Sequence, residues 1–137
     1  MSEQSIEVVK RAYAAFAEGD VPAVLGVFAD DIEWHEADGM PYGGVYRGGE
    51  AVVQNVFGPL SQDVEGFALS PEEFMAAGDT VAVVVTYTGT GKATGKALNL
   101  PVVHVWEVQD DKAVRFRQFA DTVKFAEVVP AAESVVG

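Results

Sequence analysis

The chain has 137 residues, a length that favours one domain, and 49% of them are hydrophobic, enough to bury a core. The formal net charge is −12 with 9 lysine and arginine residues, so the chain lacks the positive surface that a nucleic-acid partner requires. It has no cysteine, which excludes disulfides, thiol nucleophiles and cysteine-bound metals.

The first residues show no basic-then-apolar targeting pattern. No apolar run approaches the roughly 18 residues that a membrane span needs. We therefore expect a cytoplasmic protein with no membrane partner.

The first half of the chain predicts helices. Residues 3–18 repeat apolar side chains at helical spacing, and Gly19 suits the end of that helix. Asp20 can cap a second, short helix that has Pro22 in its first turn.

A short strand is predicted at residues 32–36, followed by residues 37–49, which are too rich in glycine and proline for regular structure. A third helix is predicted from about residue 50, and Gly58-Pro59 kinks or ends it.

The second half of the chain changes to the composition of strands. Valine, threonine and aromatic residues dominate four segments, which short turn signals separate: residues 66–76, 80–88, 97–108 and 113–119. Pro71 marks an edge or a bulge in the first of them. A last helix is predicted from Thr122 to residue 129, and residues 130–137 are expected to form a flexible tail.

Helices followed by a meander of strands indicate an α+β fold. We expect a curved, mixed or antiparallel sheet that wraps around the N-terminal helices. Because a curved sheet and a helix cannot close against each other at both ends, we also expect a pocket at one end.

Several stretches resemble one family. FAEGDVPAVLGVFADDIEWHE resembles the opening of the ketosteroid isomerase-like proteins, also called the nuclear transport factor 2-like superfamily. PYGGVYRGGEAV and LPVVHVWEVQDDKAVRFRQFADT resemble its SnoaL-like, ketosteroid isomerase-related branch. The resemblance covers about residues 5–128. It implies a single SnoaL-like domain with a cystatin-like cone fold, and a homodimer formed through the sheet. The superfamily includes isomerases, polyketide cyclases and epoxide hydrolases, so the resemblance does not fix a reaction.

The resemblance to the SnoaL-like cyclases implies functional roles for two residues. In those enzymes an aspartate just after the last strand is the general base, and a histidine lies on the preceding strand. Asp121 and His104 match these positions. The resemblance therefore implies that the segment RFRQFADT is polar because it lines a pocket that ends at Asp121.

The resemblance to ketosteroid isomerase implies a role for a third residue. The general base of that enzyme lies at the end of the first strand, and this chain has Glu36 at that position. The two hydrogen-bond donors of that enzyme's oxyanion hole fall at Ala12 and Val103, with Tyr13 and His104 only adjacent. We therefore do not expect steroid isomerase activity.

Each of these residues also has a structural interpretation. Asp121 can cap the terminal helix, and His104 can be an ordinary core or interface residue. Arg115 and Arg117 can form a salt bridge at the sheet surface or at a dimer interface. His35, Glu36 and His104 have no recognised metal-site spacing, so we expect neither a metal nor a cofactor.

Side chains alternate between the two faces of a strand. This pairs Trp34 with Glu36 and Glu33 with His35. In the last strand, the alternation places Phe116 and Gln118 on one face. It places Arg115, Arg117 and Phe119 on the opposite face. The alternation leaves open which set faces inward.

These residues predict cofactor-free acid/base chemistry of the isomerase, cyclase or hydrolase type on a small, apolar carbonyl, enol or epoxide compound. Asp121 abstracts a proton or activates water, His104 polarises the developing oxyanion, and Glu36 is the second candidate base. The expected pocket residues are Trp34, Tyr42, Tyr46, Trp106, Phe119, Gln118, Tyr13 and Phe16. Two alternatives remain: a non-catalytic binding protein for a small hydrophobic ligand, and a dimeric interaction module.

Overall fold

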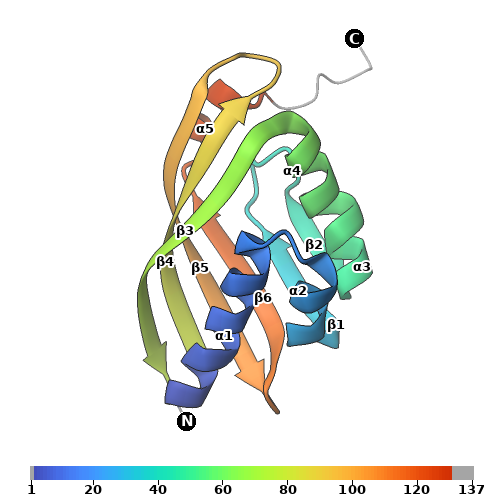
Figure 1. Ribbon diagram of the computed structural model, residues 1–137, viewed down its shortest axis with the longest axis vertical. Coiled ribbons are helices and arrows are strands. Elements are labelled where there is room, and N and C mark those ends of the chain that lie inside the picture. The colour runs from blue at the N-terminus through green and yellow to red at the C-terminus, as the bar shows by residue number, and fades with distance from the viewer. Residues whose placement is uncertain (1, 131–137) are drawn as a thin grey trace.

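The computed structural model describes residues 2–130 and shows helices on one face of a long, twisted sheet (Figure 1). The helices are α1 (Ser2–Ala17), α2 (Val21–Val27), α3 (Gly49–Val52), the π-helix η1 (Val53–Phe57), α4 (Gly58–Asp63) and α5 (Thr122–Val128). The strands are β1 (Phe28–Glu36), β2 (Gly44–Arg47), β3 (Val64–Ala77), β4 (Thr80–Gly91), β5 (Ala97–Gln109) and β6 (Lys112–Ala120).

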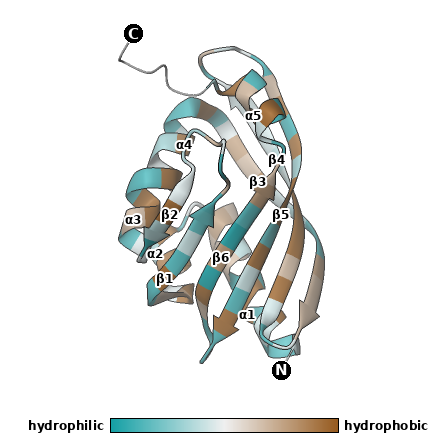
Figure 2. Ribbon diagram, turned by 180° about the vertical axis from the view of Figure 1, so that it is seen from behind, coloured by the Kyte–Doolittle hydropathy of each residue, from teal (hydrophilic) through white to brown (hydrophobic). Residues whose placement is uncertain are grey.

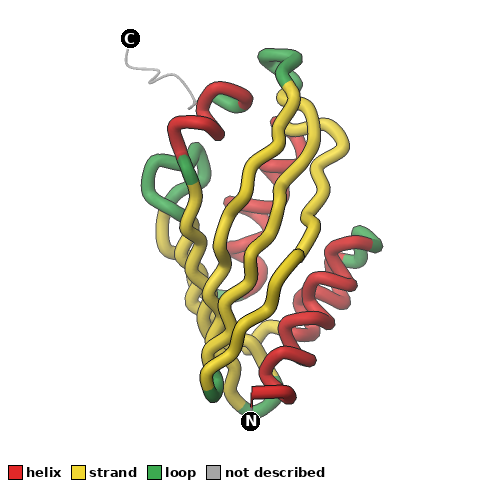
Figure 3. Tube along the Cα trace, turned by 90° about the vertical axis from the view of Figure 1, so that its left-hand side faces the viewer, coloured by secondary structure: helices red, strands yellow, loops and turns green. Residues whose placement is uncertain are grey.

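The strands form one sheet in the order β2-β1-β6-β5-β4-β3. All neighbouring strands are antiparallel except β1 and β6, which run parallel. Helix α1 lies along one face of the sheet, while α5 stands at the end of the sheet away from the N-terminus (Figure 3). Seen from behind, β1, β6 and β5 show a face that no helix covers (Figure 2). The expected α+β fold with a curved sheet around the helices is confirmed.

Local sequence explains several of these elements. The side chain of Asp20 accepts a hydrogen bond from the backbone N–H of Ala23 at 3.1 Å and so caps α2. Asp110 and Asp111 both have positive φ angles, as a two-residue hairpin between β5 and β6 requires. The register of β3 shifts between Pro71 and Glu73, which confirms the bulge predicted there.

Two expectations need correction. The turn-rich segment contains a short edge strand, β2, which pairs with β1 through Trp34 and Tyr46. The strand was not predicted because it has only 4 residues and lies in a segment rich in glycine. Of the two outcomes predicted at Gly58-Pro59, the ending of the third helix is wrong, because η1 runs directly into α4 and Pro59 lies in the first turn of α4. Apart from Pro130, the predicted tail lies outside the described residues.

The core fills the space between the sheet and the helices. Trp106, Phe116 and Phe125 are among the largest fully buried side chains. Trp34 stacks on Phe116 with ring centroids 3.6 Å apart, which ties β1 to β6 on the inner face. Within residues 2–130, no helix has the length and hydrophobicity to cross a membrane.

Candidate active site

An apolar cavity lies between the inner face of the sheet and the helices. Its volume is about 40 Å³, far below the roughly 300–1,000 Å³ of a typical ligand pocket. Strands β1 and β3 to β6 supply most of its wall, and α1, η1 and α4 close it. The lining residues are Phe16, Trp34, Glu36, Val56, Phe57, Leu60, Phe67, Leu69, Tyr87, His104, Trp106 and Phe116.

Glu36 is the acidic residue of this lining. It ends β1, and only 5% of its surface is exposed. Its Oε1 accepts a hydrogen bond from the indole N–H of Trp34 at 2.9 Å. Burial raises the pKa of the Glu36 carboxyl to about 7, although hydrogen bonds from Trp34 and Gln118 favour the ionised form. A carboxyl with such a pKa exchanges a proton readily at neutral pH.

His104 is the basic residue of the lining, and it is held on both sides. Its Nδ1 lies 2.7 Å from the hydroxyl oxygen of Tyr13, and its Nε2 lies 2.6 Å from the hydroxyl oxygen of Tyr87. Burial lowers the pKa of His104 to about 3, so the ring is neutral at neutral pH. Both ring nitrogens of His104 are therefore already hydrogen-bonded to tyrosine hydroxyls, and its role in polarising an oxyanion stays a prediction.

Two further side chains continue this network. Trp106 donates its indole N–H to the hydroxyl of Tyr13 at 2.9 Å. Gln118 donates to the hydroxyl of Tyr87 at 2.9 Å and accepts from the backbone N–H of Ala37 at 3.0 Å. Gln118 therefore connects the His104 network to the end of β1, where Glu36 lies.

The cavity brings together part of the predicted pocket. Phe16, Trp34, Glu36, His104 and Trp106 line it. Tyr13 and Gln118 stand directly behind the lining and bond to it. The inward set of the last strand is thus Phe116 with Gln118, which are 1% and 5% exposed.

Asp121 does not line this cavity, and its predicted place there is wrong. It is exposed and caps α5, where its Oδ1 accepts from the backbone N–H of Lys124 at 3.1 Å. The chain leaves the sheet after Ala120, so the carboxylate turns to the first turn of the helix. Phe119 is also outside, with 53% of its surface exposed, because it shares the outer face with Arg117.

Tyr42 and Tyr46 also lie outside the cavity. They line a separate open hollow beside α5, with a volume of about 670 Å³. Tyr42 donates its hydroxyl to Asp63 at 2.8 Å, and Tyr46 donates to the backbone oxygen of Tyr42 at 2.7 Å. Both phenols serve to hold the loop before β2 in place.

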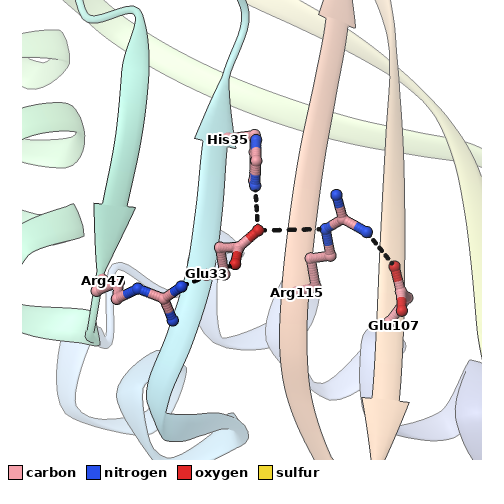
Figure 4. A network of polar contacts seen from close by, with 5 residues as sticks. All are labelled: Glu33, His35, Arg47, Glu107 and Arg115. Atoms are coloured by element: carbon pink, nitrogen blue, oxygen red, sulfur yellow. Dashed lines mark hydrogen bonds and ion pairs between the residues drawn. The ribbon is translucent and has the colours of Figure 1, made fainter.

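One polar residue of β6, Arg115, belongs to an ionic network on the outer face of the sheet (Figure 4). Arg115 lies 3.5 Å from Glu33 and 3.1 Å from Glu107, while Arg47 lies 3.2 Å from Glu33. His35 also bonds to Glu33, and this bond is the main reason that the pKa of Glu33 is lowered. The structural interpretation of Arg115 is thereby the correct one.

His35 therefore points away from Glu36 and His104, which face the cavity from the inner side. Among residues 2–130, no group of three or more histidine, aspartate or glutamate side chains could hold a metal ion.

Sequence reasoning missed one polar residue of the cavity, Tyr87. Its signal was available, because Tyr87 has the same parity in β4 as the buried residues Val81, Val83 and Val85. A polar hydroxyl in an otherwise apolar inward series needs a partner, and here that partner is His104.

Solved structures share this architecture. A nuclear transport factor 2-like protein from Burkholderia thailandensis is 38% identical, covering 90% of this chain and 95% of that one, with a TM-score of 0.87. Another, from Burkholderia pseudomallei, is 31% identical over 96% and 100% of the two chains, with a TM-score of 0.86. TerC, co-crystallized with polyporic acid, is 31% identical over 91% and 97%, with a TM-score of 0.84. No curated protein sequence matches this chain.

The fold defines a nuclear transport factor 2-like α+β protein, an architecture also described as cystatin-like. The model of the SnoaL-like domain matches residues 9–116, and the chain belongs to that family. The resemblance found in the sequence is confirmed.

Proposed function

We propose that this protein performs cofactor-free acid/base chemistry in the cavity, with Glu36 as the general base. The observation that carries the proposal is a buried carboxyl with a pKa of about 7 that faces an apolar cavity beside a neutral imidazole network. The reaction is of the isomerase, cyclase or hydrolase type. Its substrate is a small, largely apolar molecule bearing a carbonyl, enol or epoxide.

The chemistry follows from the two polar edges of the cavity. Ionised Glu36 takes a proton from a carbon next to a carbonyl, or from water, and returns it from its own carboxyl group in a later step. The hydroxyl of Tyr87, which lines the cavity and is bonded to His104, faces the negative charge that develops on the substrate oxygen. Apolar walls exclude water, which strengthens both interactions.

Access to the cavity requires movement. A volume of about 40 Å³ holds no organic molecule, so side chains at its edge must move apart when a substrate binds. Phe16, Phe57, Phe67 and Leu69 are the partly exposed apolar lining residues. The π-helix η1 carries Phe57, and π-helical turns occur often at functional sites. The co-crystal of TerC with polyporic acid supports an organic ligand for this fold.

Proton exchange into a small ketone tests the proposal. The purified protein is incubated in D₂O with a panel of cyclic and aryl ketones, and loss of the α-proton signal is followed by ¹H NMR. We expect the protein to accelerate exchange and Glu36→Gln to abolish the acceleration. Asp121→Asn is the matched control, because Asp121 lies outside the cavity.

A ketone that binds, as saturation-transfer NMR detects, but never exchanges would refute catalysis and support the alternative of a binding protein. If no probe binds and the cavity stays closed, the interaction module is the remaining reading.

We also propose that the protein is a homodimer formed through the outer face of the sheet. Val45 and Phe119 expose 59% and 53% of their surfaces there, beside the network around Glu33 and Arg115. Light scattering on the intact protein measures the mass. We expect a dimer for the wild type and a monomer for Phe119→Asp, whereas a wild-type monomer would refute the proposal.

A further inference from the structure

We infer that Tyr87 is the residue that donates a hydrogen bond to the ligand in the cavity, because the tautomer of His104 frees its hydroxyl proton. The kind of ligand, one with a carbonyl or enolate oxygen, rests on the proposed function. The inference about Tyr87 itself rests on the count of protons in the His104 network.

Two members of the network have fixed roles. The indole N–H of Trp106 can only donate, so the Tyr13 oxygen accepts from it. The backbone N–H of Ala37 can only donate, so it fixes the amide oxygen of Gln118 as an acceptor. The amide nitrogen of Gln118 is then a donor, and the Tyr87 oxygen accepts from it.

The remaining two bonds join His104 to the tyrosines. A neutral imidazole has one N–H, so it donates one of these bonds and accepts the other. One tyrosine must therefore give its proton to the ring, while the other accepts a second hydrogen bond. The hydroxyl proton of that second tyrosine has no partner inside the network.

The surroundings decide which tyrosine this is. Tyr13 is 5% exposed, does not line the cavity, and has the ring of Phe74 at 6.0 Å. Among residues 2–130, its hydroxyl has no hydrogen-bond partner other than His104 and Trp106. A free Tyr13 proton would thus be buried without an acceptor, which is unfavourable because the donor has lost its bond to water. Tyr87 lines the cavity, where a ligand oxygen or a water can accept its proton.

His104 therefore carries its proton on Nε2, donates it to Tyr87 and accepts from Tyr13 on Nδ1. The hydroxyl proton of Tyr87 points into the cavity that Glu36 also faces. Gln118 holds this arrangement, since it bonds to Tyr87 and to the carboxyl of Glu36. A ligand oxygen accepts from Tyr87 while the neighbouring carbon meets the carboxylate of Glu36.

Nitrogen NMR reads the tautomer directly. The chain has only 2 histidines, so protein labelled with ¹⁵N at histidine gives two sets of ring signals, and His35→Gln identifies those of His104. Long-range ¹H–¹⁵N correlation at neutral pH shows which ring nitrogen carries the proton. We expect Nε2. A proton on Nδ1 would overturn the inference, because Tyr87 would then donate its hydroxyl proton to Nε2 and have none left for a ligand.

The same samples separate this inference from the proposed function, because the tautomer is read without substrate or turnover. Where ketone exchange is observed, Tyr87→Phe should slow it by about 100-fold, as the loss of one oxyanion donor does elsewhere. The exchange rate of the Tyr87→Phe variant should still change with pH over the range in which Glu36 ionises in the wild type. An unchanged rate in Tyr87→Phe would overturn the donor role. Absence of exchange in the wild type, with the proton on Nε2, would refute the proposed function alone.

Discussion

The burial of Glu36 predicts an unusual dependence of stability on pH. In the unfolded chain its carboxyl loses its proton near the ordinary pKa of 4.5, whereas in the folded protein it keeps the proton up to about pH 7. Between these values the folded state binds more protons than the unfolded state, so the free energy of unfolding falls as the pH rises. The effect is absent below about pH 4.5 and complete above about pH 7.

Its size follows from the two pKa values. Each tenfold change in an acid dissociation constant is worth about 1.4 kcal/mol, so a rise from 4.5 to about 7 corresponds to about 3 kcal/mol. Glutamine at this position keeps the acceptor for the Trp34 indole but does not ionise. Glu36→Gln should therefore gain about 3 kcal/mol in stability relative to the wild type between about pH 4.5 and pH 8.

Urea unfolding of both proteins across this pH range measures the difference. The buried His104 acts in the opposite direction, since its lowered pKa makes the fold less stable in acid, but it is present in both proteins and cancels. Glu72→Gln, at an exposed site on β3, is the control for the effect of the substitution itself. A flat difference for Glu36→Gln would show that this carboxyl ionises normally, and would remove the basis for its role as a base at neutral pH.

Three further variants test the surroundings of the site. Asp121→Ala should lose the cap of α5 and about 1 kcal/mol of stability in thermal unfolding, while a fall in the ketone exchange rate would contradict its place outside the cavity. Gly91→Ala puts a methyl group 2.2 Å from the backbone oxygen of Val128, so urea unfolding should show a loss of about 2 kcal/mol, and wild-type stability would contradict this contact. Phe57→Ala should widen the cavity at about 2–3 kcal/mol of stability, and should increase the fluorescence of an anilinonaphthalene dye; unchanged dye binding would show that Phe57 does not close the cavity.

The parts of the fold that follow a local period could be predicted from the sequence. Alternation alone separated Glu36 from His35, and the structure confirms that these residues face opposite sides of β1. It also separated Gln118 from Arg117. Only packing, however, could reveal which of these two faces the cavity, because either parity suits a strand with one buried face.

The parts that depend on how the chain leaves an element could not be predicted. Asp121 follows the last strand by one residue, and the turn into α5 decides whether its carboxylate meets the cavity or the helix. Tyr87 reaches His104 across the sheet, although its own register partner is Leu100. Such a diagonal contact depends on side-chain length and strand twist, which no spacing in the sequence records.

The parallel pairing of β1 with β6 has a consequence for the order of folding. Ala37, next to Glu36, bonds to Gln118 across 81 positions of sequence, and Trp34 stacks on Phe116 from the same late strand. Contacts of such long range close late, because the entropy of a long loop is lost before they form. During synthesis, Glu36 leaves the ribosome long before β6 exists and remains a hydrated, ordinary carboxylate. The raised pKa of its carboxyl is therefore coupled to completion of the sheet, and an incomplete chain lacks the proposed base.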